Sequence, residues 1–381
     1  MKICAIICEY NPFHNGHLYQ LNEAKRLSGA DALLCIMSGN FVQRGEAAIM
    51  EKHMRAKHAI LAGADAVIEL PTLFATSNAE LFAKGAVSVL SSIPAVATLC
   101  FGAETINKTA FILSARYLND EPKEVSEKIK NAVGKGTGYA KARAQAWAGF
   151  IPIDLMTSPN NILGLEYTRA LLSCHSSIQI LPIERIGSAY NDNELKESYS
   201  SASAIRAAIT HREAIAQNVP EYVVQDLPST LESRLDVLEK YALLSHTLKE
   251  IASVCDCTEG LEHALKKAAL LASPLAETLT SSRYTSSRIR RIALQNLLKI
   301  DENLIRESLY SPLYLRVLAA KKGRTDILSA LSESPFPIIV RAHDENVLNE
   351  VAKQCYERDR FAEQVYSLLY ENTAEEKDIF I

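Results

Sequence analysis

Apolar and polar positions follow two different periods in the first quarter of the chain. Short runs that are apolar almost throughout predict strands at 2–8, 30–37, 66–70 and 97–101. Amphipathic stretches between these runs predict helices at 17–28, at 51–62 and near 78–90. Strands that lack a polar face belong to parallel sheets that helices cover on both sides. The pattern therefore predicts a doubly wound α/β domain.

The rest of the chain is expected to be mostly helical. A further strand is predicted at 177–183, followed by a helix at 201–211 whose serines cap its first turn. Beyond Pro220 the strand signal fades, and helices are predicted at 230–252, 261–272, 286–300 and 346–372. We accordingly divide the chain into a doubly wound α/β domain, 1–220, and an α-helical C-terminal domain, 221–381.

Composition narrows the class of protein. The chain has 381 residues and a net charge of −4, and no apolar run approaches the ~20 residues of a membrane-spanning helix. Its first residues lack a small-residue cleavage site and predict a strand rather than a signal peptide. Eight cysteines, mostly in apolar stretches, fit a cytoplasmic protein. We expect no metal site, because Cys255, Cys257 and His263 lack a standard zinc-ligand spacing.

The loop between the first strand and the first helix is rich in hydrogen-bonding side chains, including His14-Asn15-Gly16-His17. In a parallel sheet this loop lies at the carboxyl edge, where ligands bind. A helix N-terminus attracts phosphate, and Gly16 lets a ligand approach the backbone. His14 and His17 can both face one phosphate and neutralise the charge that develops as its bond to a leaving group breaks. An isolated His-x-x-His is usually structural, but this position favours a functional role.

This tetrapeptide resembles the His-x-Gly-His signature of the nucleotidyltransferase superfamily, which includes the class I aminoacyl-tRNA synthetases. A second superfamily signature, a serine-rich turn before Ile-Arg at a helix start, is similar to residues 201–206, with serine where threonine is common. The resemblance implies attack on the α-phosphate of a nucleoside triphosphate, with magnesium neutralising the pyrophosphate. The residues implied to hold the triphosphate are His14, His17 and Arg206, with Ser201 and Ser203 binding its oxygens.

Longer segments resemble the bacterial tRNA(Met) cytidine acetate ligase family: EYNPFHNGH, MSGNFVQRGE, SPNNILGLEY, RIGSAYND and RYTSSRIRR. The resemblance extends over essentially the whole chain. It implies an ATP-dependent ligase that joins acetate to AMP as acetyl-adenylate and releases pyrophosphate. The acetyl group would then pass to N4 of the wobble cytidine of elongator tRNA(Met), with release of AMP.

The same resemblance implies a set of ATP contacts. They are Ile7, Cys8, Glu9, Tyr10, Asn11, Pro12, Phe13, His14, Asn15, Gly16, His17, Leu18, Tyr19, Gln20, Gly102, Asn160 and Arg185. Asn161 is the alternative to Asn160, because the two asparagines are adjacent. We place the acetate or the cytosine near Ser38, Gly39, Asn40 and Gln43, although a Ser-Gly-Asn turn after a strand is equally often only a loop.

A basic stretch lies in the predicted helical domain. Residues 278–300 contain five cations and no acidic residue. Arginines three positions apart can share one side of a helix, and a neighbouring tyrosine offers a surface on which RNA bases stack. A solvated helix face is the ordinary explanation of such a stretch, whereas the family resemblance favours tRNA binding. The expected tRNA-binding residues are Arg283, Tyr284, Arg288, Arg290 and Arg291.

Two other functions are compatible with these features. The chain could be a different nucleotidyltransferase that acts on a small phosphorylated metabolite, or a non-catalytic RNA-binding protein that kept the fold. The long helical domain disfavours the first, because such enzymes rarely need one. The presence of both signatures disfavours the second, because a binding protein needs neither the histidines nor Arg206.

Overall fold

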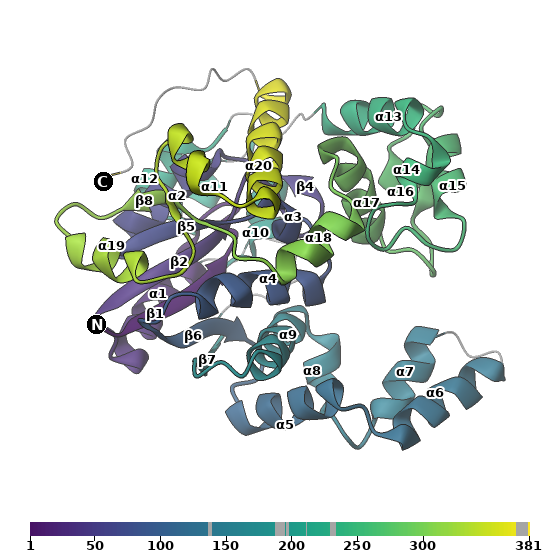
Figure 1. Ribbon diagram of the computed structural model, residues 1–381, viewed down its shortest axis with the longest axis horizontal. Coiled ribbons are helices and arrows are strands. Elements are labelled where there is room, and N and C mark those ends of the chain that lie inside the picture. Colours follow the sequence, from purple (N-terminus) through teal and green to yellow (C-terminus); the bar gives the residue numbers. More distant parts are fainter. Residues whose placement is uncertain (136–138, 187–194, 196–197, 211, 229–233, 371–379) are drawn as a thin grey trace.

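A seven-stranded sheet forms the centre of the computed structural model, in the order β7-β6-β1-β2-β5-β8-β9 (Figure 1). The structure describes the chain apart from 136–138, 187–194, 196–197, 211, 229–233 and 371–379, so most of the RIGSAYND segment lies outside the described residues. The strands are β1 (Ile3–Cys8), β2 (Ala32–Ser38), β5 (Ala66–Leu70), β6 (Val96–Ala103), β7 (Gln179–Glu184), β8 (Leu315–Ala320) and β9 (Ile338–Ile339). The hairpin of β3 (Phe41–Val42) and β4 (Glu46–Ala47) forms a separate small sheet.

The predicted doubly wound sheet is confirmed. All five strands expected from the sequence form, and they pair in parallel from β7 to β5. Every residue of β1 is buried, and its side chains alternate between two apolar cores: Ile3 and Ile7 enter one, Cys4 and Ile6 the other. Burial on both faces explains why the strand carries no polar position.

Helices of the first half cover both faces of the sheet. The helices α1 (Asn15–Ser28) and α2 (Lys52–Leu61) pack on one face, and α3 (Thr72–Ala75), α4 (Ala79–Ser91) and α9 (Pro159–Ser173) pack on the other. Helix α1 ends at Gly29, which takes a left-handed φ of 57°. The remaining helices of this half are α5 (Lys108–Asn119), α6 (Lys123–Gly134), α7 (Tyr139–Trp147), α8 (Ile153–Thr157), α10 (Ala202–Ala207) and α11 (Arg212–Ile215).

The strand order reverses at β1. From β1 the chain runs outward through β2 to β5, then crosses back to β6 and β7 on the opposite side of β1. Strands β1 and β6 are therefore neighbours, with Ile6 opposite Cys100. In open α/β sheets the crevice at such a reversal, outside the carboxyl ends of the strands, is where ligands bind. The loop that follows Cys8 opens into this crevice.

The C-terminal half contains the helices α12 (Glu221–Asp226), α13 (Leu235–Ser245), α14 (Leu248–Ile251), α15 (Leu261–Ala268), α16 (Leu275–Leu279), α17 (Ser286–Leu298), α18 (Glu302–Leu309), α19 (Thr325–Ser332) and α20 (Glu350–Leu369), and the 3₁₀ helix at Ala342–Val347. The sequence missed β8, which joins the sheet antiparallel to β5. Its leucines, alanines and arginine are good helix formers, so pairing with β5 decides its conformation. The boundary at residue 220 stays a prediction. None of the helices in the described residues is long and apolar enough to cross a membrane.

Helix α17 packs against the β3–β4 hairpin through a glycine. Gly45 has a φ of 73°, and a Cβ built on it would lie 2.5 Å from the backbone nitrogen of Arg291. The hairpin and the helix therefore approach at backbone distance, and a side chain at position 45 would push them apart.

We expect Gly45→Ala to destabilise the protein more than Gly29→Ala. Both residues are left-handed, which costs roughly 1–2 kcal/mol for alanine, but nothing lies within 4 Å of a Cβ at Gly29. Overpacking against α17 should add about 1–3 kcal/mol. Midpoints of guanidinium unfolding measure the difference. Equal losses in the two variants would contradict the close packing of the hairpin on α17.

Candidate active site

Two histidines cap the first helix reciprocally. His14 is the N-cap of α1, and its Nδ1 accepts the backbone N–H of Gly16 at 3.1 Å. The backbone N–H of His14 donates to Nδ1 of His17 at 3.3 Å. Because each Nδ1 is an acceptor, the hydrogen-bond network assigns the proton of each neutral ring to Nε2. The cap thus presents two N–H donors.

The two imidazoles are stacked, with His14 buried and His17 partly buried. Their ring centroids lie 3.6 Å apart. Burial, aided by the charges of Arg185 and Arg206, lowers the pKa of His14 to about 3. Burial, His14 and Arg185 lower the pKa of His17 well below its ordinary value. The sequence predicts that these side chains neutralise phosphate charge; the lowered pKa values and the acceptor role of each Nδ1 favour neutral rings that donate from Nε2.

Gly16 is needed at the start of α1 because the His14 ring lies against it. A Cβ at this position would lie 2.9 Å from Cε1 of His14. The glycine therefore lets the histidine ring fold back over the first turn and complete the cap.

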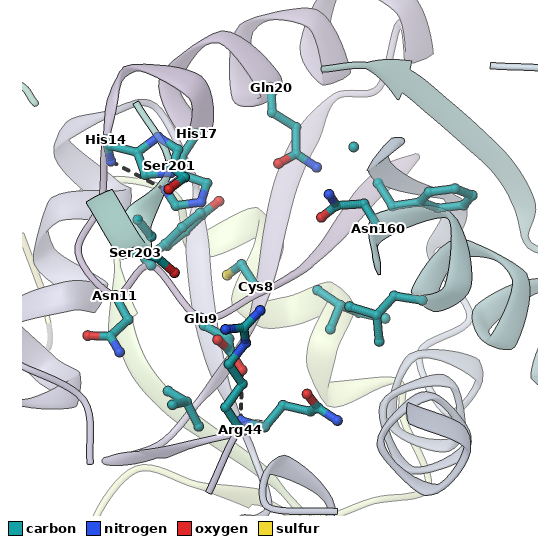
Figure 2. A pocket seen from close by; sticks show the side chains of 18 of the residues that line it. Cys8, Glu9, Asn11, His14, His17, Gln20, Arg44, Asn160, Ser201 and Ser203 are labelled. Carbon is teal, nitrogen blue, oxygen red and sulfur yellow. Dashed lines mark hydrogen bonds between the residues drawn. The ribbon is translucent and has the colours of Figure 1, made fainter. Parts of the chain in front are cut away.

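A cleft opens between this cap, the ends of β1 and β6, the β3–β4 hairpin and the helices α9 and α10 (Figure 2). Many of the residues implied by the resemblance line it: Ile7, Cys8, Glu9, Tyr10, Asn11, His14, His17, Gln20, Gly102, Asn160, Arg185, Ser201, Ser203 and Arg206. A smaller pocket adjoins it and adds Gly16 and Tyr19. The fold therefore gathers most of the predicted set around one cavity at the strand reversal.

The serine signature meets the histidine loop through Arg206. Ser201 caps α10, its hydroxyl oxygen accepting the N–H of Ala204 at 3.0 Å. The guanidinium of Arg206 donates to the backbone oxygen of Asn11 at 2.7 Å and to Oγ of Ser203 at 3.3 Å. One side chain thus ties together two signatures that lie far apart in the sequence.

The opposite wall of the cleft settles which of the adjacent asparagines faces it. Asn160 lines the cleft, and its side chain contacts Arg185 at 3.5 Å and Glu104 at 2.7 Å. Asn161 is fully buried, and its Oδ1 accepts the backbone N–H groups of Glu104 and Thr105 at 3.0 and 3.1 Å. Of the two side chains, that of Asn160 therefore faces the cleft.

Comparison with known proteins identifies the family. A family model described as HIGH Nucleotidyl Transferase matches residues 1–379. The tRNA(Met) cytidine acetate ligase of Caldanaerobacter subterraneus subsp. tengcongensis is 38 % identical over 394 residues, covering 98 % of this chain and 97 % of that protein. The protein of the same name from Thermosipho africanus is 34 % identical, covering 99 % and 97 %. The chain belongs to the tRNA(Met) cytidine acetate ligase family.

Solved structures agree with this assignment. The crystal structure of Thermotoga maritima TmcAL in its apo form is 30 % identical, with a TM-score of 0.89 and coverage of 97 % of this chain and 95 % of that one. The crystal structure of the same protein bound with alpha-thio ATP is 29 % identical, with a TM-score of 0.86, and covers 97 % and 94 %. The family fold, including the C-terminal helices, therefore extends over almost the whole chain.

Some residues implied by the family resemblance do not reach the cleft. Pro12, Phe13, Asn15 and Leu18 line neither cavity. Phe13 is fully buried in the core, and the Asn15 side chain donates to the backbone oxygens of Ser198 and Gln217 at 3.1 and 2.8 Å. These side chains hold the loop in place from behind.

Of the residues predicted to lie near the acetate or the cytosine, one lines the cleft and three are buried. Gln43 lines the cleft, but Ser38, Gly39 and Asn40 lie beneath its wall. The backbone oxygens of Ser38 and Gly39 accept hydrogen bonds from the buried Arg55. Oδ1 of Asn40 accepts the backbone N–H of Lys52 at 2.8 Å. These three residues are thus positioned by buried partners.

Sequence reasoning missed two charged residues and an apolar wall of the cleft. Arg44 and Glu46 come from the β3–β4 hairpin, inside the segment MSGNFVQRGE. The signal available for them was the pair of charged residues in the polar segment 43–46, shortly after the predicted strand at 30–37. The apolar wall offered no comparable signal, because its residues resemble any core position: Phe82, Phe101, Leu163 and Tyr167.

The arginines of the basic stretch do not form one cationic face. Arg290 pairs with Glu46 of the hairpin, and Arg291, only 12 % exposed, lies 3.9 Å from Asp256. Arg283 and Arg288 flank the ring of Tyr284, with guanidinium carbons 5.7 and 5.1 Å from its centroid. Arg283 also pairs with Glu259 at 2.9 Å, and Arg288 donates to the backbone oxygen of Asp256 at 2.8 Å. This trio, Arg283, Tyr284 and Arg288, is the part of the stretch that shares one surface.

The state of the histidine cap can be tested by ¹⁵N NMR on protein labelled at histidine, in a buffer free of phosphate. With a pKa of about 3, His14 should stay neutral, with its proton on Nε2, throughout the range in which an ordinary histidine becomes protonated near pH ~6.5. Because the unfolded chain takes up this proton and the folded chain does not, acidification below that range should also destabilise the fold. Titration of His14 near its ordinary pKa would contradict the assigned cap.

Proposed function

We propose that this chain is an ATP-dependent ligase that acetylates N4 of the wobble cytidine of elongator tRNA(Met). The observation that carries the proposal is the Arg206 bridge, which brings Ser203 to the histidine loop at the strand reversal. Membership of the tRNA(Met) cytidine acetate ligase family supplies the chemistry. A tRNA substrate would place the reaction in the cytoplasm.

In the first step, a carboxylate oxygen of acetate attacks the α-phosphate of ATP and pyrophosphate leaves. The Nε2–H groups of His14 and His17 donate to the phosphate oxygens, and the N-terminus of α1 adds its dipole. Arg206, already bound to Ser203, supplies a fixed cation at the same place.

Magnesium enters this proposal as part of the ATP substrate. Mg²⁺ usually keeps several waters and binds through substrate phosphates with one or two carboxylates. The described residues contain no group of three His, Cys, Asp or Glu side chains that could hold a metal ion. An ion that binds through the substrate phosphates and water, and neutralises pyrophosphate, needs no such group.

In the second step, the cytidine amine attacks the carbonyl of acetyl-adenylate and AMP leaves. Acetyl-adenylate reacts with water, so the intermediate needs a sheltered site. The apolar wall of Phe82, Phe101, Leu163 and Tyr167 gives the cleft a dry side, with Gln43 on its polar side. We place the acetyl group between them.

The proposal is tested by incubating the protein with ATP, labelled acetate and tRNA, and locating the label after nucleoside digestion. N4-acetylcytidine, pyrophosphate and AMP should form together. His17→Ala should slow pyrophosphate release roughly 100- to 1,000-fold, because it removes one positioned donor. His263→Ala, at a residue 69 % exposed on α15, should have no effect. ATP turnover that needs a phosphorylated metabolite, or tRNA binding without turnover, would overturn the proposal.

We further propose that Arg283 and Arg288 contact tRNA phosphates, with Tyr284 between them. Replacing both arginines with glutamine should weaken tRNA binding and reduce the slope of log affinity against log salt by about 2, because each arginine accounts for one phosphate contact. ATP affinity should not change. Arg26→Gln is the control: like Arg283, that arginine is exposed and paired with a glutamate, but it lies at the far end of α1. A wild-type slope in the double variant would place the tRNA surface elsewhere.

A further inference from the structure

The second step of the proposed reaction needs a proton acceptor, a requirement that rests on the proposed function. The attacking group is N4 of cytosine, an exocyclic amine whose lone pair is delocalised into the ring. Such an amine must lose a proton as its bond to the acetyl carbon forms. A positioned general base typically contributes roughly 10²- to 10⁴-fold to the rate of a transfer of this kind.

The histidines and one of the carboxylates are already engaged. Nδ1 of His14 and of His17 accepts a backbone N–H, so their Nε2 atoms carry protons and donate. Two carboxylates line the main cleft among the described residues. Glu46 forms ion pairs: its Oε1 binds Arg290, and its Oε2 lies 4.0 Å from Arg206. Glu9 is the carboxylate that remains.

Glu9 is held with one oxygen free. It directly follows β1, at the strand reversal, and Tyr10 after it turns the chain with a left-handed φ of 47°. Its Oε1 accepts the backbone N–H of Gln43 at 2.8 Å, and its backbone oxygen accepts a hydrogen bond from Arg55 at 2.5 Å. Its Oε2 has no hydrogen-bond partner among the described residues. Figure 2 shows this carboxylate in the cleft, between Cys8 and Arg44.

We propose that Glu9 is the general base of the acetyl transfer. The bond from N4 to the acetyl carbon forms and the bond from that carbon to the α-phosphate oxygen breaks. AMP leaves with the electron pair of the broken bond, and the N4 proton passes to Oε2 of Glu9. Release of this proton to water restores the carboxylate for the next turnover.

The surroundings of Glu9 favour this role. Burial raises its pKa, which makes it a stronger base than an exposed carboxylate. Four groups oppose this rise: the Gln43 N–H from the hairpin, Arg206 from α10, Arg55 from α2 and Arg44 from the hairpin. The hydrogen bond to Gln43 also fixes the rotamer, so that the free oxygen points the same way in every turnover.

The test compares Glu9→Gln with Glu46→Gln. Glutamine keeps the size of Glu9 and can still accept the Gln43 N–H, so the fold should be preserved; thermal unfolding checks this. Each enzyme is loaded with acetyl-adenylate from ATP and acetate, then mixed with tRNA. The rate of N4-acetylcytidine formation is followed in a single turnover at several pH values, alongside the rate of adenylate formation without tRNA.

In the wild type, transfer should rise with pH through the pKa of Glu9 and then level off. Glu9→Gln should lower the ratio of transfer rate to adenylation rate about 100-fold or more and lose this rise. Glu46→Gln, which removes a charge from the same cleft, should keep it. Titration of the tRNA is common to all three enzymes, so the difference between their profiles reports the protein group.

Three results would overturn the assignment. If Glu9→Gln keeps the wild-type pH profile, the base is another group. If Glu46→Gln loses the rise equally, the effect comes from the charge of the cleft rather than from Glu9. If Glu9→Gln slows both steps by the same factor, Glu9 binds ATP instead. A wild-type enzyme that forms no N4-acetylcytidine would overturn the proposed function as well.

Discussion

Arg55 is fully buried, and its guanidinium donates hydrogen bonds to the backbone oxygens of Glu9, Ser38, Gly39 and Met50. A buried cation is costly unless its donors are satisfied, and here the ends of β1 and β2 and the segment before α2 turn their carbonyls toward it. The arginine thereby holds the carboxyl ends of neighbouring strands in one arrangement. The cleft opens at this point, and the Glu9 side chain leaves the backbone beside it.

Residues of the C-terminal part of the chain form ion pairs with β5 and with the start of α2, close to Arg55. Lys52 binds Glu69 at 2.6 Å and also pairs with Glu363 of α20, while Arg316 of β8 reaches Glu69 and Glu363 at 3.2 and 2.8 Å. Burial would raise the pKa of Glu363, but Lys52 and Arg316 hold it at about 2. These buried pairs are geometrically demanding, because an unpaired partner would be costly. They hold β5, β8 and α20 together, and Tyr366 of α20 makes an edge-to-face contact with Phe41 of the hairpin.

Local pattern was enough to place the histidine loop. A strand buried on both faces is apolar throughout, and a helix that ends at Gly29 follows the loop. The order strand, loop, helix can therefore be predicted from the sequence pattern, without knowledge of tertiary contacts. That order puts His14 and His17 at a helix N-terminus beside the carboxyl end of β1. The protonation state of the two rings could not be predicted from the sequence pattern. It follows from burial and from Arg185 and Arg206, which come from distant parts of the chain.

By itself, the sequence determined the five parallel strands, the helices between them and the two signatures, because each depends on periodicity or on a short motif. Tertiary structure alone decided the rest. It made a strand of β8, turned Asn160 rather than Asn161 into the cleft, and buried Ser38, Gly39 and Asn40 beneath its wall. Each of these outcomes depends on a contact with a segment that is distant in the sequence: β8 pairs with β5, Asn161 binds the residues after β6, and the segment 38–40 binds Arg55 and Lys52. Such pairings between distant segments leave no periodic trace along the chain.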